Sequence, residues 1–255
     1  MNHIKIELNH VSFGYEKEKN ILNNISFTAA ERESIGLIGA NGAGKSTLLK
    51  MLVGLNLGYE GNIYVEELSV QKETLAKVRE KIGYVFQDSD SQLFMSTAYE
   101  DIAFAPRNYG LTEEEVNKRV AYALSQVHID YLKDRQIYKM SGGEKKLVSI
   151  ATILSMMPDI ILMDEPSIAL DPKNRRNLIR ILNEFSHLKI IASHDLDMIL
   201  DTCERTILLS DGKIVADGKT EEILSNQKLL EENGLELPLC MQRKNGLELP
   251  LCMQK

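Results

Sequence analysis

Residues 39–47 constrain the fold of this chain more than any other stretch. They read Gly-Ala-Asn-Gly-Ala-Gly-Lys-Ser-Thr and fit G-x-x-x-x-G-K-[ST], the pattern of a phosphate-binding loop. The apolar run before them, at 34–38, predicts a buried strand, and residues 48–52 predict a helix that ends near Gly54. Strand, glycine loop and helix in this order are the context that the pattern requires. We therefore expect an α/β fold built around a nucleotide phosphate site.

The residue types in this loop suit anion binding. Glycines at 39, 42 and 44 let the backbone turn tightly and point N–H groups at phosphate oxygens. The helix that begins near Lys45 adds the partial positive charge of its N-terminus. Lys45 supplies a full charge for the β- and γ-phosphates, and the Ser46 hydroxyl is placed to ligate Mg²⁺. The predicted phosphate cradle comprises Gly39, Asn41, Gly42, Gly44, Lys45, Ser46 and Thr47.

Length, charge and hydropathy narrow the class of protein. The 255 residues, of which 44% are apolar, suffice for one large α/β domain with a subdomain. A net charge of −7 argues against a nucleic-acid partner bound through phosphate neutralisation. No apolar run approaches the roughly 18 residues of a membrane span, and the N-terminus lacks the apolar stretch of a signal peptide. Only three cysteines are present, which suits a reducing cytoplasm.

The periodicity of apolar residues changes along the chain. Strands are predicted at 4–8, 11–13, 25–27, 62–65, 81–86, 160–163, 190–192, 206–210 and 213–216. Residues 92–155 look helical, with a capping box at Thr112, and predict a helical subdomain inserted into the α/β core. Asp171 and Pro172 predict the start of a helix, and Asp211-Gly212 predicts a hairpin.

An acidic pair ends the predicted strand at 160–163. Asp164 stands at the tip of this buried strand, where a carboxylate can reach Mg²⁺ directly or through water. Glu165 follows and can polarise an attacking water as a general base. An acidic pair after a strand is often only a solvated loop, but here it follows a phosphate loop in the same chain. We therefore expect both residues to be functional.

Four weaker signals gain meaning only together. Ser141, Gly142 and Gly143 open a helix whose free N–H groups form a second anion site, although the same letters also suit an ordinary cap. His194 ends a predicted strand and could donate to a γ-phosphate, although a lone histidine is more often structural. Gln87 also follows a predicted strand, and its side chain could ligate Mg²⁺ or water there. Tyr15 could stack on a base or simply pack in the core.

In chain order these motifs resemble those of ATP-binding-cassette ATPases over about residues 3–225. The matching features are an aromatic loop at Tyr15, Walker A, a Q-loop at Gln87, the signature at 141–144, Walker B at 160–165, a D-loop at 167–171 and a switch histidine at His194. The resemblance implies a P-loop NTPase (RecA-like) core with an antiparallel β-subdomain and an inserted helical subdomain. It also implies head-to-tail dimers, in which ATP lies between one chain's Walker A and the signature of the other.

A finer resemblance is to the ATPases of energy-coupling-factor importers. Residues 87–94, 100–106 and 234–238 carry it, and 190–197 with 203–205 look most like the cobalt/nickel branch. It implies an Mg²⁺-ATPase on the cytoplasmic face of the membrane, acting as a homodimer or with a paralogous cassette. Its partners would be a membrane-embedded coupling component and a substrate-binding component. The alternatives are a vitamin importer of the same type, a non-transport cassette ATPase, and a purely structural nucleotide-binding subunit.

The signature departs from the usual family pattern. It has Met140 where Leu is usual, Glu144 where Gln is usual, and Leu147 where Arg is common. A carboxylate at 144 would weaken ATP-driven closure if it pointed at the phosphate site, so we expect Glu144 to point away from it.

The tail, residues 226–255, contains an exact duplication. Residues 233–242, Asn-Gly-Leu-Glu-Leu-Pro-Leu-Cys-Met-Gln, recur at 245–254. The simplest explanation is a recent duplication or an error of sequence assembly. The alternative is a soft-metal site made by Cys240, Met241, Cys252 and Met253.

Overall fold

A computed structural model describes residues 3–16 and 20–244 of the chain. Its larger sheet has six strands in the order β10-β9-β3-β8-β7-β6, and the central strands are parallel. These strands are β3 (Ser34–Ile38), β6 (Ile82–Val85), β7 (Ile160–Asp164), β8 (Leu188–Ala192), β9 (Arg205–Ser210) and β10 (Lys213–Lys219). Strands β9 and β10 form the antiparallel hairpin predicted from Asp211-Gly212.

A second sheet has four antiparallel strands in the order β2-β1-β4-β5. They are β1 (Ile4–Phe13), β2 (Leu22–Ala30), β4 (Glu60–Val65) and β5 (Leu68–Ser69). The prediction of separate strands at 4–8 and 11–13 was wrong, because both belong to β1. His10 has a φ of 52°, and the pairing of β1 with β2 shifts register between Leu8 and Val11. This irregularity bends one strand without ending it.

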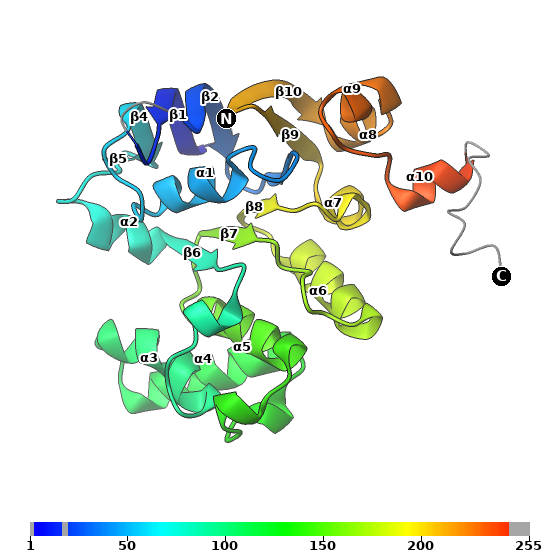
Figure 1. Ribbon diagram of the computed structural model, residues 1–255. Coiled ribbons are helices and arrows are strands. Elements are labelled where there is room, and N and C mark those ends of the chain that lie inside the picture. The colour runs from blue at the N-terminus through cyan, green and yellow to red at the C-terminus, as the bar shows by residue number, and fades with distance from the viewer. Residues whose placement is uncertain (1–2, 17–19, 245–255) are drawn as a thin grey trace.

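Helices cover the large sheet on both faces (Figure 1). In the α/β part these are α1 (Lys45–Leu52), α2 (Leu75–Lys81), α6 (Pro172–Glu184) and α7 (Leu196–Thr202). Side chains of β7 alternate between two hydrophobic clusters: Ile160 and Leu162 pack with α1, and Ile161 and Met163 pack with α6 and α7. The continuous apolar run therefore reflects a strand that is buried on both faces.

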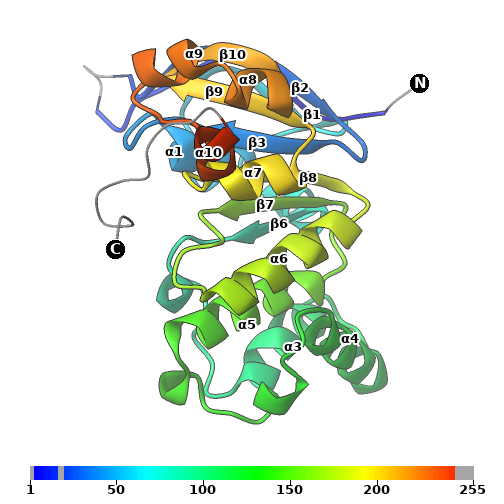
Figure 2. The ribbon, with the colours of Figure 1, turned by 90° about the vertical axis from the view of Figure 1, so that its right-hand side faces the viewer.

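A helical layer lies at one end of the molecule (Figures 1 and 2). It contains α3 (Ala98–Asn108), α4 (Glu113–Gln126) and α5 (Gly142–Leu154). The predicted capping box is present, since Thr112 accepts a bond from Glu115 N and the Glu115 carboxylate accepts one from Thr112 N. Val116, Val120 and Leu124 of α4 are buried against α3 and α5.

The described part of the chain ends in three short helices. They are α8 (Thr220–Leu224), α9 (Gln227–Glu232) and α10 (Leu239–Lys244). The Asp197 carboxylate accepts hydrogen bonds from the N–H groups of Leu239 (3.1 Å) and Cys240 (3.0 Å), which fixes α10 against α7 (Figure 2). The second copy of the repeat, with Cys252 and Met253, lies outside the described residues. Within residues 3–16 and 20–244, no helix has the length and apolar character to span a membrane.

Candidate functional site

The phosphate loop connects β3 to α1 with a backbone that needs glycine. Gly44 is the N-cap of α1 with a φ of 104°, and a Cβ there would lie 2.6 Å from Leu22 Cδ2. A Cβ on Gly39 would lie 2.3 Å from the carbonyl oxygen of Leu209. Asn41 to Thr47 all line one cavity of about 470 Å³ at the start of α1. The helix N-terminus is therefore open to an anionic ligand.

Lys45 is the one cation buried in this loop, as far as the described residues go. Its Nζ donates to the carbonyl oxygens of Gly39 (2.7 Å) and Ala40 (3.2 Å). Burial lowers the pKa of Lys45, while the negative charges of Glu165 and Asp164 oppose the shift. A phosphate in the loop would give the amine a charged acceptor in place of two carbonyls, which strengthens its hydrogen bonds.

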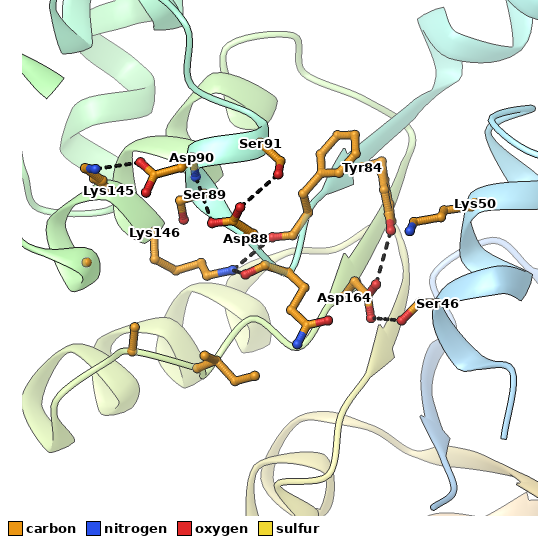
Figure 3. Close-up of a pocket in the computed structure, with 15 residues that line it drawn as sticks. Ser46, Lys50, Tyr84, Asp88, Ser89, Asp90, Ser91, Lys145, Lys146 and Asp164 are labelled. Carbon is orange, nitrogen blue, oxygen red and sulfur yellow. Dashed lines mark hydrogen bonds and ion pairs between the residues drawn. The ribbon is translucent and has the colours of Figure 1, made fainter. Parts of the chain in front are cut away.

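Asp164 joins the phosphate loop to β6 and β7. Its Oδ1 accepts a hydrogen bond of 2.9 Å from Ser46 Oγ, and its Oδ2 accepts one of 3.2 Å from Tyr84 Oη (Figure 3). Burial, followed by the charge and hydrogen bond of Asp164, raises the pKa of Tyr84, so the hydroxyl keeps its proton. A serine hydroxyl and a carboxylate at this distance offer the hard oxygen ligands that Mg²⁺ prefers.

Glu165 and His194 lie beside the cavity, just after the ends of the neighbouring strands β7 and β8. Glu165 has a φ of 48°, and its N–H donates to the carbonyl of Ala192 at 2.8 Å. Its Oε2 lies 2.7 Å from His194 Nδ1 and accepts bonds of 3.2 Å from Ser193 Oγ and from His194 N. Both side chains line the cavity of the phosphate loop. The left-handed backbone turns Glu165 out of the strand toward that cavity, and such strain is common at functional sites.

Gln87 connects two adjoining cavities. It lines the one beside the phosphate loop and a second one, of about 450 Å³, between the sheet and the helical layer. The second cavity is also lined by Ser46 and Asp164 (Figure 3). Gly142 lines it as well. Gln87 follows β6 by two residues, so its backbone position is set by the end of that strand.

The signature residues open α5. Ser141 is the N-cap of this helix. The residues that line the phosphate-loop cavity do not include Ser141, Gly142 or Gly143. A Cβ on Gly143 would lie 3.2 Å from the carbonyl of Ala169, so the helix start packs closely on its own D-loop. The structure thus brings Walker A, Walker B, Gln87 and His194 to the phosphate-loop cavity. Among the signature glycines, Gly142 lines only the adjoining cavity, and Gly143 lines neither of the two.

The three unusual signature residues have clear structural places. Glu144 completes a capping box: its Oε2 accepts 2.8 Å from Ser141 N, and its Oε1 lies 3.8 Å from Arg135. The N–H groups of Gly142 and Gly143 have no intrahelical acceptor, because they lie in the first turn. Met140 and Leu147 are buried in the core of the helical layer, where an arginine at 147 would lack water.

Tyr15 lies near the start of α1 but remains 60% exposed. Its hydroxyl is 3.5 Å from Thr47 Oγ1 and accepts a bond of 3.0 Å from Asn56 Nδ2. The ring contacts Phe13 edge to face, with centroids 5.1 Å apart. One face of this ring is therefore available beside the phosphate loop.

Two polar residues at the site escaped the sequence analysis. Tyr84 lies in the apolar strand β6. The one signal in the sequence was a hydroxyl among hydrophobic neighbours, which implies a buried polar partner. Lys146 follows Lys145 and reads as a solvated charge, yet it is buried and bonded to the backbone of the Q-loop.

The fold and this site define a P-loop nucleotide-binding protein. Residues 22–168 match the pattern of the ABC transporter family. A putative ABC transporter ATP-binding protein of Geobacter sulfurreducens is 47% identical over 242 residues, 95% of this chain and 97% of the relative. The chain therefore belongs to the ABC transporter family and is an ATPase of the ATP-binding-cassette class.

Two further comparisons describe more specific relatives. The energy-coupling factor transporter ATP-binding protein EcfA of Carboxydothermus hydrogenoformans is 38% identical, over 94% of this chain and 89% of its own length. The solved structure of cbiO1 from Clostridium perfringens, described as part of the ABC transporter complex cbiONQ, superposes with a TM-score of 0.81 at 30% identity. That comparison covers 96% of this chain and 100% of cbiO1. The predicted P-loop NTPase fold is confirmed.

Proposed function

We propose that the chain is the ATP-hydrolysing subunit of an energy-coupling-factor importer that takes up cobalt or nickel ions. The similarity to EcfA supports the importer type, and the similarity to cbiO1 favours the metal-ion branch. The observation that carries the enzymatic part is the Ser46–Asp164 hydrogen bond beside the Glu165–His194 pair. Ser46, Glu165 and His194 line the phosphate-loop cavity of about 470 Å³, and Asp164 lines the adjoining cavity that shares Ser46 and Gln87.

In this proposal each polar residue has a separate task. The loop backbone and Lys45 hold the β- and γ-phosphates, and Ser46, Asp164 and Gln87 hold Mg²⁺ directly or through water. The metal neutralises charge that develops on the transferred phosphoryl group. Glu165 orients the attacking water, and His194 contacts the γ-phosphate once ATP replaces its bond to Glu165.

Two copies of the cassette complete the site. Ser141, Gly142 and Gly143 do not line the phosphate-loop cavity of their own chain, which supports a head-to-tail pair, homodimeric or with a paralogous cassette. The helix start then presents the free N–H groups of Gly142 and Gly143 to the γ-phosphate held by the partner. Closure on ATP and reopening after hydrolysis follow from the different affinities of the dimer for ATP and ADP.

An exposed aromatic pair beside the Q-loop suits a membrane-embedded coupling component. Phe94 is 65% exposed and Phe104 is 37% exposed, and their rings meet edge to face at 4.8 Å. The buried Asp101 carboxylate accepts the N–H groups of Phe94 (3.2 Å) and Met95 (3.2 Å), which fixes this loop. Docking here would hold the cassette on the cytoplasmic face of the membrane.

Uptake of radioactive cobalt or nickel tests the function most directly. The chain is expressed with the membrane subunits encoded beside its gene, and a matched strain carries Glu165→Gln. ATP-dependent metal uptake that is lost in the variant supports the proposal. Uptake of biotin or riboflavin instead would support the vitamin-importer alternative, and ATPase activity without uptake of any of these cargoes would favour a non-transport cassette.

A further inference from the structure

Lys146 is a buried cation to which the proposed chemistry gives no task. It lies on α5 and is 1% exposed. Its Nζ donates hydrogen bonds to the carbonyl oxygens of Phe86 (2.9 Å) and Gln87 (2.7 Å). Figure 3 labels Lys146 among the residues that line the cavity. Burial lowers the pKa of Lys146 to about 8, against the charges of Asp164, Asp88 and Glu165. Burying a charged amine is unfavourable unless hydrogen bonds or opposite charges replace its contacts with water.

Lys146 is the centre of a set of tethers between α5 and the segment 86–92. Lys145 Nζ lies 2.5 Å from Asp90 Oδ1 at the surface. Gln92 Nε2 donates to Ser149 O and Thr152 Oγ1, both at 2.8 Å, and its Oε1 accepts from Phe86 N at 3.1 Å. These bonds hold the ends of the Q-loop to the helix. Only the Lys146 bond reaches the peptide unit of Gln87 itself, among the bonds of the described residues.

In the proposed pair of cassettes, the two ends of this connection would serve different nucleotides. Gln87 lines the cavity of its own phosphate loop, whereas Ser141 to Gly143, at the start of α5, do not line that cavity. Lys146 is five positions after Ser141 on the same rigid helix. A displacement of Gln87 by ligand would therefore pass through the Lys146 bond to the helix start that faces the other chain.

We propose that Lys146 is a positioning residue that binds Gln87 to the signature helix, so that both shift as one unit when ATP enters the site. This inference rests on the proposed two-copy site. Lys146 lines the adjoining cavity but not the phosphate-loop cavity, so its removal should change nucleotide binding to one chain little. It should weaken ATP-driven pairing of two chains, because the signature then responds less to the ligand at Gln87.

The test uses the full chain with Glu165→Gln, which blocks turnover, and compares Lys146→Met with Lys145→Met. Binding of a fluorescent ATP analogue is measured at low protein concentration, and dimerisation with ATP and Mg²⁺ is measured by sedimentation. We expect Lys146→Met to bind the analogue within about twofold but to dimerise about tenfold more weakly, a change of about 1.4 kcal/mol. The matched control, which loses only a surface ion pair, should stay within about twofold in both.

A double-mutant cycle with Gln87→Ala separates positioning from general support of the fold. If Lys146 acts through Gln87, Lys146→Met should change dimerisation by less than about twofold once Gln87→Ala is present. An undiminished tenfold loss in that background would overturn the proposal, as would wild-type dimerisation of Lys146→Met.

Two controls ensure that each outcome of the experiment has one interpretation. If Lys146→Met does not fold, Lys146→Gln replaces it, because the amide still donates to one carbonyl. The same double-mutant cycle is then measured, and dimerisation should weaken by about threefold. If the Glu165→Gln chain with an intact Lys146 fails to dimerise, the two-copy function itself is wrong, and this outcome is distinct from a failure of the Lys146 inference.

Discussion

The Ser46 hydroxyl donates a hydrogen bond of 2.9 Å to Asp164 Oδ1 and thereby joins the first turn of α1 to the tip of β7. The two residues are 118 positions apart in the chain. Parallel pairing of β7 with β8, and of β8 with β3, brings their strand ends to one edge of the sheet. Both oxygens therefore lie at the carboxyl edge of the sheet, where the proposed magnesium site would form.

Replacing Asp164 with Asn should separate metal binding from nucleotide binding. The amide removes the negative charge but keeps the size of the side chain, so ATPase activity should fall about 100-fold or more. Nucleotide affinity without Mg²⁺ should stay within about twofold or rise, because a nearby negative charge is lost. Titration of nucleotide with and without Mg²⁺ measures both, and an unchanged Mg²⁺ effect in Asp164→Asn would contradict the assignment.

Tyr84→Phe should raise the Mg²⁺ concentration required for tight ATP binding. The variant keeps the ring and its contact with Phe86, but Asp164 Oδ2 loses a donor. One hydrogen bond to a charged group is worth about 1.5–3 kcal/mol, so a shift of at least about tenfold is expected. The matched control is Tyr59→Phe, which loses a bond to the Val70 carbonyl in the other sheet and should not change the Mg²⁺ requirement.

Lys45→Met should weaken ATP binding without unfolding the chain. Nζ now bonds to two loop carbonyls, and methionine fills the same volume without the charge. The loss of a charge-assisted bond to phosphate should reduce ATP affinity by at least about tenfold. Thermal unfolding without nucleotide serves as the control, and ATP affinity that matches the wild type would refute the role of Lys45.

Glu144→Gln should leave ATPase activity within about twofold. Gln can accept the same hydrogen bond from Ser141 N, so the capping box survives the change. The carboxylate also lies near Arg135, which offsets part of its charge. Steady-state ATPase rates of the two chains decide this point. A rise of about tenfold or more would mean that the carboxylate repels the partner's nucleotide.

Local patterns in the sequence predicted local structure well. The Asp171 cap, the Thr112 capping box and the hairpin at Asp211-Gly212 depend on bonds within a few residues, and all are present. The bulge at His10 has no recognisable pattern in the sequence, so β1 was predicted as two separate strands. The apolar alternation across that bulge resumed in a different register, which is how a strand end looks in sequence.

Contacts between distant segments were harder to foresee. Asp164 was singled out because an acidic residue at a strand tip after a phosphate loop has a clear chemical use, but its bond to Tyr84 depends on the pairing of β6 with β7. Lys146 resembles its exposed neighbours in sequence, and only the packing of α5 against the Q-loop shows that it is buried. Burial of a polar group is a property of the tertiary fold.

Trapping of a nucleotide-bound dimer by Glu165→Gln tests the central claim most directly. With ATP and Mg²⁺, sedimentation of the variant should show two chains holding intact ATP, while ADP or the added change Lys45→Met should leave single chains. Hydrolysis should be nearly lost, because the group that orients water is gone. Single chains under ATP and Mg²⁺, or full ATPase activity of Glu165→Gln, would contradict the account.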